Sequence, residues 1–198
     1  ARLEVVVREL MAEPARAEQL LVRQNRAWQT IRLARPGRPT WVEIDLPAIG
    51  NNVRRMAELV GPGVRIMAVL KADAYGHGAI RVGRTAVNNG ASYLGVACLG
   101  EASALRAAGI DTPILILGFT PAWQARELIL VDAAAAIFTL DVARALSRAA
   151  VELNRPVVVH VKVDTGMGRL GLLPHEVVPF VEEARRLPNL ILEGIFTH

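Results

Sequence analysis

Residues 65–78 read RIMAVLKADAYGHG, an apolar run that stops at Lys71 and continues into a loop containing two glycines. The run over residues 65–70 is short and bounded by turn residues, a pattern that indicates a buried strand. A second run of this kind, over residues 157–163, also ends in a polar, glycine-containing loop. Continuous apolar strands of this type are typical of a parallel sheet that is covered by helices.

Strand and helix patterns alternate along the chain on both sides of these two runs. Short joints containing glycine or proline separate them, and an early strand followed by a helix precedes the repeat. The predicted strands cover residues 41–45, 65–70, 93–97, 113–117, 133–138, 157–163 and 190–196. The predicted helices cover residues 48–60, 79–88, 101–108, 121–130, 140–153 and 174–187.

Two α/β architectures compete for this pattern. A doubly wound sheet calls for a glycine-rich phosphate turn after its first strand, and no G-x-G-x-x-G sequence follows residues 65–70. A (β/α)8 TIM barrel needs eight strand–helix units in roughly 250 residues. Six strands fit a barrel that lacks two units, so we predict an α/β fold, a (β/α)8 TIM barrel truncated after about six strands.

Composition excludes several classes of function. The 198 residues are 52% hydrophobic, with no apolar run long enough for a bilayer. We expect no secretory leader, no membrane partner and no metal site. The net charge of +4 could suggest nucleic acid, but the arginines are scattered and aromatic residues make up only 5%. A single cysteine, Cys98, fits a reducing cytoplasm.

The two lysines are candidates for a role in catalysis or cofactor binding. Of the 23 basic residues only Lys71 and Lys162 are lysines, and lysine can lose its proton to become a nucleophile or base, whereas arginine effectively cannot. Both lysines, and also His198, stand at the ends of predicted strands. In a barrel the carboxyl ends of the strands share one rim, where active sites lie. We therefore expect these three side chains to face a common site.

The chemistry of that rim suggests an aldehyde cofactor. An amine at the edge of an apolar strand is partly desolvated, which favours its neutral, nucleophilic form. Such an amine suits Schiff-base formation. Tyr75 follows Lys71 by four residues and can offer a hydroxyl to a phosphate, while Gly76 and Gly78 permit close backbone approach.

Four segments resemble the alanine racemase family. VLKADAYGHG at 69–78 resembles its cofactor-lysine motif. WVEIDL at 41–46, with the Ala-Ile and Asn-Asn pairs that follow, resembles its opening strand and helix. HVKVDTGMGR at 160–169 and GIFTH at 194–198 resemble two further signatures. The resemblance covers about residues 39–198, in the family's order and at its spacing.

The resemblance implies a role for each matching residue. Lys71 would form the Schiff base with pyridoxal 5'-phosphate and act as one catalytic base, and Tyr75 would contact the phosphate. Arg169 would be catalytic too, orienting the substrate carboxylate and the phenolic oxygen of the cofactor. Lys162 would be a carbamylation candidate, its anion holding Arg169. His198 would pack against the pyridine ring.

The resemblance further implies a pyridoxal-phosphate-dependent racemase that interconverts L-alanine and D-alanine and supplies D-alanine for peptidoglycan. It would be cytoplasmic and a homodimer in the full-length protein. The second base would come from the partner subunit's C-terminal β-domain, which we expect to be absent from this chain, so the fragment alone is predicted to be inactive. The alternatives are a racemase of another amino acid such as serine, a non-catalytic pyridoxal-phosphate-binding barrel protein, and a related decarboxylase, which the motifs disfavour.

Residues 1–38 are predicted to be a separate N-terminal part, and residues 39–198 a partial pyridoxal-phosphate-binding barrel. An apolar helical stripe and a proline-rich joint suggest either a simple extension or the tail of an upstream fused domain with its linker. The stripe comprises Leu3, Val6, Val7 and Leu10. This part resembles the last helix and tail of a Mur-type peptidoglycan ligase.

Four other residues receive structural interpretations. We expect His77 to order its loop and His160 to be a satisfied strand histidine. Cys98 is interpreted as a small buried hydrophobe. Asp164 is expected to pin the loop that presents Arg169.

Overall fold

The computed structural model describes residues 19–24, 27–32 and 42–198 of the chain. The chain divides into two compact units, residues 1–43 and 44–198, and each is described by itself. In the first unit, β1 (Gln19–Gln24) pairs antiparallel with β2 (Ala27–Arg32). The apolar stripe predicted between residues 3 and 10 lies outside the described residues, and the predicted domain boundary stays a prediction.

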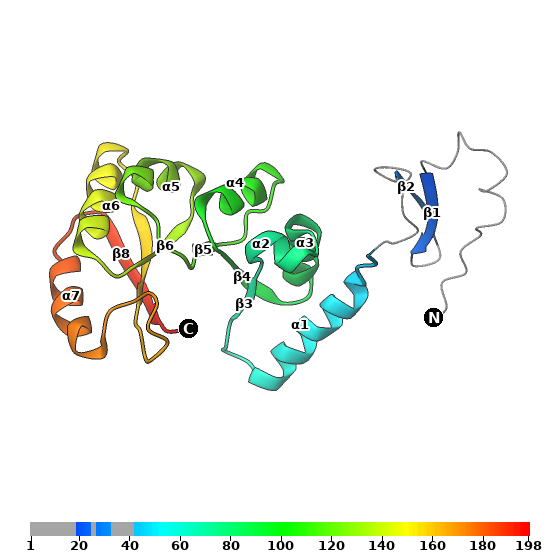
Figure 1. The fold of residues 1–198 in the computed structure, drawn as a ribbon, viewed down its shortest axis with the longest axis horizontal. Coiled ribbons are helices and arrows are strands. Elements are labelled where there is room, and N and C mark those ends of the chain that lie inside the picture. Colours follow the sequence, from blue (N-terminus) through cyan, green and yellow to red (C-terminus); the bar gives the residue numbers. More distant parts are fainter. Residues whose placement is uncertain (1–18, 25–26, 33–41) are drawn as a thin grey trace. The chain divides into compact units, whose positions relative to one another are not determined.

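The second unit is built on a six-stranded, fully parallel sheet with the order β3-β4-β5-β6-β7-β8. Figure 1 shows these strands succeeding one another in the order of the chain. The strands are β3 (Ile66–Val69), β4 (Ala91–Val96), β5 (Ile114–Ile116), β6 (Ala134–Ile137), β7 (Val157–Lys162) and β8 (Leu190–Phe196).

Strand order decides between the two architectures. In a doubly wound sheet the spatial order of successive strands reverses at a switch point, whereas here each strand is added on the same side of the one before it. Right-handed crossovers then place every connecting helix on the same face, so the sheet curls with its other face inward. The predicted partial barrel is confirmed, with β3 and β8 as its edge strands.

Helices connect the strands and cover their outer face. The α-helices are α1 (Leu46–Val60), α2 (Lys71–Gly76), α3 (Ala79–Asn88), α4 (Leu99–Ala107), α5 (Ala125–Val131), α6 (Leu140–Glu152) and α7 (Val177–Ala184). Single 3-10 turns, η3 (Ala122–Gln124) and η4 (Pro174–Glu176), lead into α5 and α7. The predicted helices and the six barrel strands are confirmed, with ends that differ by a few residues.

Two separate cores show that the sheet has an inside and an outside. The larger core joins the strands to the helices. The smaller core is formed by side chains from the other face of the strands. Its members are Tyr93, Leu115 and Ala134, with Met67, Leu117, Val158 and Phe196 packed against them. A filled interior of this kind is the core of a barrel, not a pore.

The strand predicted over residues 41–45 is wrong where the structure describes it. Residues 42–45 have no regular structure, and residue 41 lies outside the described part. The Asp45 carboxylate instead accepts a hydrogen bond from the backbone N–H of Ala48 at 2.9 Å. This N-cap, with Pro47 in the first turn, starts α1 at Leu46. The segment therefore serves as a helix entry.

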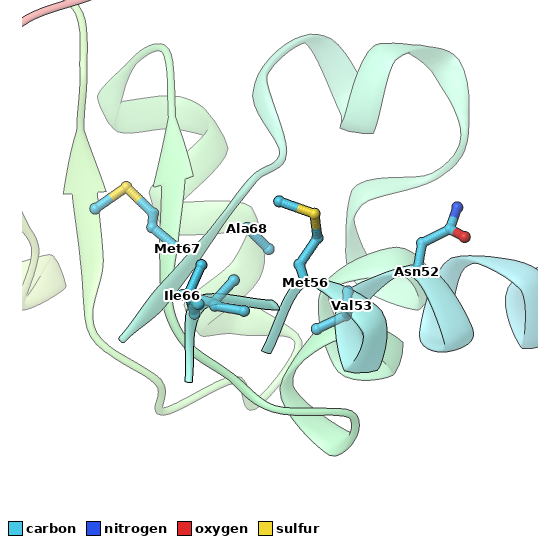
Figure 2. Close-up of a pocket in the computed structure, with 7 residues that line it drawn as sticks. Asn52, Val53, Met56, Ile66, Met67 and Ala68 are labelled. Atoms are coloured by element: carbon cyan, nitrogen blue, oxygen red, sulfur yellow. The ribbon is translucent and has the colours of Figure 1, made fainter. Parts of the chain in front are cut away.

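A cavity of about 270 Å³ lies between α1 and β3, at the edge of the sheet. Figure 2 shows the side chains that the two elements contribute to it. The lining residues are Asn52, Val53, Met56, Val60, Ile66, Met67 and Ala68. None of them is charged or nucleophilic, so this cavity offers no group for catalysis.

Candidate active site at the carboxyl ends of the strands

The segment after β3 has an unusual backbone. Lys71 begins α2, and the next four residues, Ala72 to Tyr75, all have φ between 53° and 57° and ψ between 36° and 51°. These are left-handed helical angles, and none of the four is glycine. An L-residue loses roughly 1–2 kcal/mol in this region, so the turn costs about 4–8 kcal/mol in local conformational energy. Sequence reasoning predicted only a loop here.

Hydrogen bonds hold this left-handed turn in place. The backbone N–H of Ala74 donates to the carbonyl of Leu70 at 2.7 Å. The Asp73 carboxylate accepts from the N–H of Ala79 at 2.6 Å and so ties the turn to the start of α3. A strained backbone that persists because its surroundings fix it is typical of functional sites.

His77 closes the same turn. Its Nδ1 lies 2.9 Å from the carbonyl oxygen of Ala74 and 3.1 Å from that of Tyr75. Both partners are acceptors, so Nδ1 carries the hydrogen and donates. The prediction that His77 orders its loop is confirmed.

Tyr75 returns to the rim beside Lys71, as the spacing suggested. The Lys71 ammonium lies 5.7 Å from the centroid of the Tyr75 ring, within the range of a cation–π contact. The Tyr75 side chain is 59% exposed. The left-handed turn therefore presents an amine and a phenol side by side at the end of β3.

Lys162 is buried at the end of β7, with only 4% of its surface exposed. Its Nζ donates to the carbonyl of Leu117 at 2.9 Å and lies 5.3 Å from the centroid of the Phe196 ring. Burial lowers the pKa of this amine, and the positive charges of Arg169 and Lys71 lower it further. The structure thus brings Lys71, Lys162 and Arg169 together, from the ends of two strands and the loop after β7.

The loop that carries Arg169 is fixed by Asp164. Its carboxylate accepts from the backbone N–H groups of Gly166 at 2.9 Å, Gly168 at 3.0 Å and Arg169 at 3.0 Å. The bonds from Gly168 and Gly166 are the main cause of a lowered pKa of this carboxyl. The prediction that Asp164 pins this loop is confirmed.

The last turn of the loop needs a glycine. Gly171 has φ of 131°, and a Cβ there would lie 2.6 Å from the backbone nitrogen of Asp164. The Thr165 and Thr197 hydroxyls, 2.7 Å apart, also fix the loop to the end of β8. His198 follows directly and is exposed at the same rim.

A polar network joins side chains of β4, β7 and β8. The Tyr93 hydroxyl donates to the Glu193 carboxylate at 3.3 Å, and His160 Nε2 lies 3.0 Å from the same oxygen. Burial and the Glu193 carboxylate raise the pKa of Tyr93 to about 12. His160 is thus satisfied, as expected, and Tyr93 is a protonated donor, not a base. The interpretation of Cys98 as buried is wrong, since it is exposed at the N-terminus of α4.

Sequence reasoning missed two residues of this region. Leu117 supplies the carbonyl that binds Lys162, and Glu101 accepts the backbone N–H of Ala72 at 2.7 Å. Neither had a local sequence signal, because a backbone carbonyl carries no identity and Glu101 stands 29 residues from its partner. In the described part of the chain, no group of histidine, cysteine and acidic residues could hold a metal. No helix there is long and apolar enough to cross a bilayer.

Fold and site together define a partial parallel β/α barrel with a lysine at the end of β3, a buried lysine at the end of β7 and an arginine in the loop that follows β7, all at its carboxyl-end rim. The family described as "Alanine racemase, N-terminal domain" matches residues 44–198. The chain belongs to this family.

Individual relatives agree with the family match. The chain is 50% identical over 161 residues to the alanine racemase of Desulfovibrio desulfuricans, covering 81% of this chain and 43% of that protein. It is 40% identical over 161 residues to the alanine racemase of Methanococcus maripaludis, with the same coverages. The chain thus spans less than half the length of these relatives.

Solved structures show the same similarity. Alanine racemase from Bacillus anthracis with bound L-Ala-P superimposes with a TM-score of 0.75 at 38% identity, over 83% of this chain and 43% of that one. Alanine racemase from Clostridium difficile 630 in complex with cycloserine gives 0.72 at 36% identity, over 77% and 42%.

Proposed function

We propose that this chain binds pyridoxal 5'-phosphate through Lys71 and belongs to a protein that interconverts L-alanine and D-alanine. The convergence of Lys71, Lys162 and Arg169 at one rim carries the proposal. None of these three cations has a described carboxylate within ion-pair distance. Cationic side chains that are not engaged in ion pairs suit two anions, the phosphate of the cofactor and the carboxylate of an amino acid.

The residues present fit the cofactor. Its aldehyde needs a primary amine, which Lys71 provides at the edge of the rim. Its phosphate needs donors, and the Tyr75 hydroxyl stands on the same turn as Lys71. When bound, pyridoxal phosphate delocalises the electron pair left by removal of the α-proton.

Each residue then has a role in racemisation. The Lys71 Nζ binds the cofactor and moves the α-proton on one face of the substrate. The Arg169 guanidinium would orient the substrate carboxylate and the phenolic oxygen of the cofactor, helped by the Asp164 carboxylate that fixes its loop. His198 would pack against the pyridine ring. Racemisation by two bases needs a second base on the opposite face, so we expect the 198-residue chain alone to be inactive.

We also propose that Lys162 is carbamylated. Its lowered pKa raises the fraction of neutral amine, the form that attacks carbon dioxide. The ammonium first loses one proton to become the neutral amine. As the nitrogen–carbon bond forms, one carbon–oxygen π bond of carbon dioxide opens and the nitrogen loses a second proton, so the carbamate carries a negative charge where the ammonium carried a positive one. This anion would attract Arg169, whereas an unmodified ammonium repels it.

The finer biological assignments follow the family. We propose a homodimer for the full-length protein, a cytoplasmic location and a supply of D-alanine for peptidoglycan. Relatives named alanine racemase, at 40–50% identity, support alanine as the substrate.

Reductive labelling tests the site directly. The chain is mixed with pyridoxal phosphate, reduced with borohydride, and digested for peptide mapping. We expect the label on Lys71, and its loss in Lys71→Ala although Lys162 remains. Label spread over other amines, or unchanged labelling in Lys71→Ala, would contradict the proposed site.

Activity is tested in the full-length protein. Addition of L-alanine is expected to yield D-alanine, and Lys71→Ala is expected to abolish this. A panel of amino acids that includes serine checks the substrate. Faster racemisation of serine than of alanine would replace alanine as the proposed substrate, and a loaded protein that racemises no amino acid would indicate a cofactor-binding role without catalysis.

A further inference from the structure

The backbone around Lys71 passes from a strand to a left-handed turn within two residues. The parallel ladder between β3 and β4 ends with the N–H of Leu70, which donates to the carbonyl of Gly95 at 2.7 Å. Lys71 comes next, and Ala72 already has left-handed angles. The direction of the Lys71 side chain therefore depends on what fixes the backbone at Ala72.

The carboxylate of Glu101 fixes it. One oxygen accepts the backbone N–H of Ala72 at 2.7 Å, and the other accepts the backbone N–H of Ala97 at 2.7 Å. Ala97 directly follows β4, so the carboxylate bridges the chains that leave β3 and β4 just beyond the last ladder bond. Distances of this length are typical of charge-assisted hydrogen bonds.

Only an ionised carboxylate serves both donors. Each oxygen of Glu101 faces an N–H group, so a protonated acid or an amide would turn a hydrogen toward one of them. Glu101 lies in the first turn of α4, where its carboxylate is near the positive end of the helix dipole. Both the negative charge and the length of the Glu101 side chain are therefore needed for it to bind the two N–H groups.

We infer that Glu101 is a positioning residue, whose bridge to Ala72 and Ala97 holds the left-handed turn and thereby directs the Lys71 amine toward the cofactor. The inference rests on the proposed role of Lys71. Without the bridge, Ala72 is free to return to a right-handed conformation, which relieves local strain and rotates the amine. A displacement of about 1 Å at a reacting group costs on the order of a hundredfold in rate.

The test compares two variants of Glu101 with a matched control, using pyridoxal phosphate as the probe. Glu101→Gln keeps the size and loses the charge, whereas Glu101→Asp keeps the charge and shortens the reach. Glu127→Gln alters an exposed glutamate in the first turn of α5. For each chain, the rate of borohydride-trapped label at Lys71 is measured together with the midpoint of thermal unfolding.

A second reagent separates direction from exposure. Acetic anhydride acylates any exposed amine, so its rate at Lys71 reports accessibility and not orientation toward a bound cofactor. We expect Glu101→Gln to lower the labelling rate with pyridoxal phosphate by about tenfold to a hundredfold while leaving acylation within about twofold. Glu101→Asp is expected to fall between wild type and Glu101→Gln, and Glu127→Gln to match wild type.

The outcomes separate this inference from the proposed function. Label at Lys71 in wild type and equal label in Glu101→Gln would overturn the role of Glu101 and leave the proposed site intact. Equal losses of labelling and acylation, with a lower unfolding midpoint, would show a purely structural role and also overturn it. If Glu101→Gln does not fold, the Glu101→Asp comparison decides, and wild-type labelling by that variant would refute the bridge. Absence of label at Lys71 in wild type would overturn the proposed function, and with it this inference.

Discussion

Arg106 is expected to be among the residues that contribute most to stability outside the site. Its guanidinium donates to four backbone carbonyls, those of Ile110 at 2.6 Å, Thr112 at 2.8 Å, Asp132 at 2.8 Å and Val131 at 3.2 Å. These carbonyls belong to the segments that lead into β5 and β6. One side chain of α4 therefore ties together the entries to two neighbouring strands.

The magnitude follows from the number of bonds and their exposure. A hydrogen bond to a charged group contributes about 1.5–3 kcal/mol, so four would sum to roughly 6–12 kcal/mol if they were all buried. Arg106 is only partly buried, and water can replace the bond to the carbonyl of Asp132 on the surface. We therefore expect Arg106→Ala to lower the free energy of unfolding by about 3–4 kcal/mol, near the upper end of single substitutions.

Urea unfolding followed by far-ultraviolet circular dichroism measures this loss. Arg84→Ala is the matched control, because Arg84 donates to a single backbone carbonyl, that of Ala108, from the surface. We expect it to cost less than about 1 kcal/mol. Arg106→Lys retains the charge without the planar fork of donors, and it should recover less than half of the loss.

Two results would refute this reasoning. Equal losses in Arg106→Ala and Arg84→Ala would show that the number of carbonyls bound does not matter. Full stability in Arg106→Lys would show that the charge, and not the geometry of the guanidinium, is what stabilises these segments.

Three further predictions concern titration and backbone geometry. The variant Tyr75→Phe leaves Tyr93 as the only phenol of the sequence, and its absorbance titration should have a midpoint near 12. The stability that this raised pKa confers is full below about pH 10 and is lost as pH rises through 12. A midpoint near 10 in the folded chain would contradict the hydrogen-bond network around Tyr93. The lowered pKa of Asp164 implies the opposite pH dependence. In urea unfolding, wild type should have a larger free energy of unfolding than Asp164→Asn above about pH 4, and this difference should disappear as pH falls. A difference that does not depend on pH would refute this role of the Asp164 carboxylate. Gly171→Ala should lower the free energy of unfolding by more than about 1 kcal/mol, because its Cβ would meet backbone atoms at a positive φ. Gly100→Ala, in a helix with open space around the position, should raise the free energy of unfolding by about 0.5 kcal/mol. Equal effects of the two substitutions in urea unfolding would refute the steric argument.

The order of elements could be predicted from the sequence because each element has a local cause. Apolar runs such as residues 65–70 and 157–163 are short, continuous and bounded by turn residues, and helices with one apolar face separate them. Parallel strands linked by helices put their carboxyl ends on one side, so Lys71 and Lys162 could be assigned to a common rim. The strand expected over residues 41–45 failed, since an apolar pattern predicts pairing but cannot show whether a partner strand exists.

The tertiary structure alone decided how the rim and the polar network of β4, β7 and β8 are built. Glu101 meets Ala72 across 29 positions, Lys162 meets the Leu117 carbonyl across 45, and Tyr93 meets Glu193 across 100. No local pattern encodes such contacts, because they depend on which segments the curled sheet brings within about 3 Å of each other. The left-handed turn after Lys71 is of the same kind: Ala72, Ala74 and Tyr75 have no intrinsic preference for positive φ, and a contact from a distant part of the chain, the Glu101 carboxylate, stabilises it. The sequence by itself determined which residues reach the rim, and the packing of distant segments determined their conformation, burial and charge environment there.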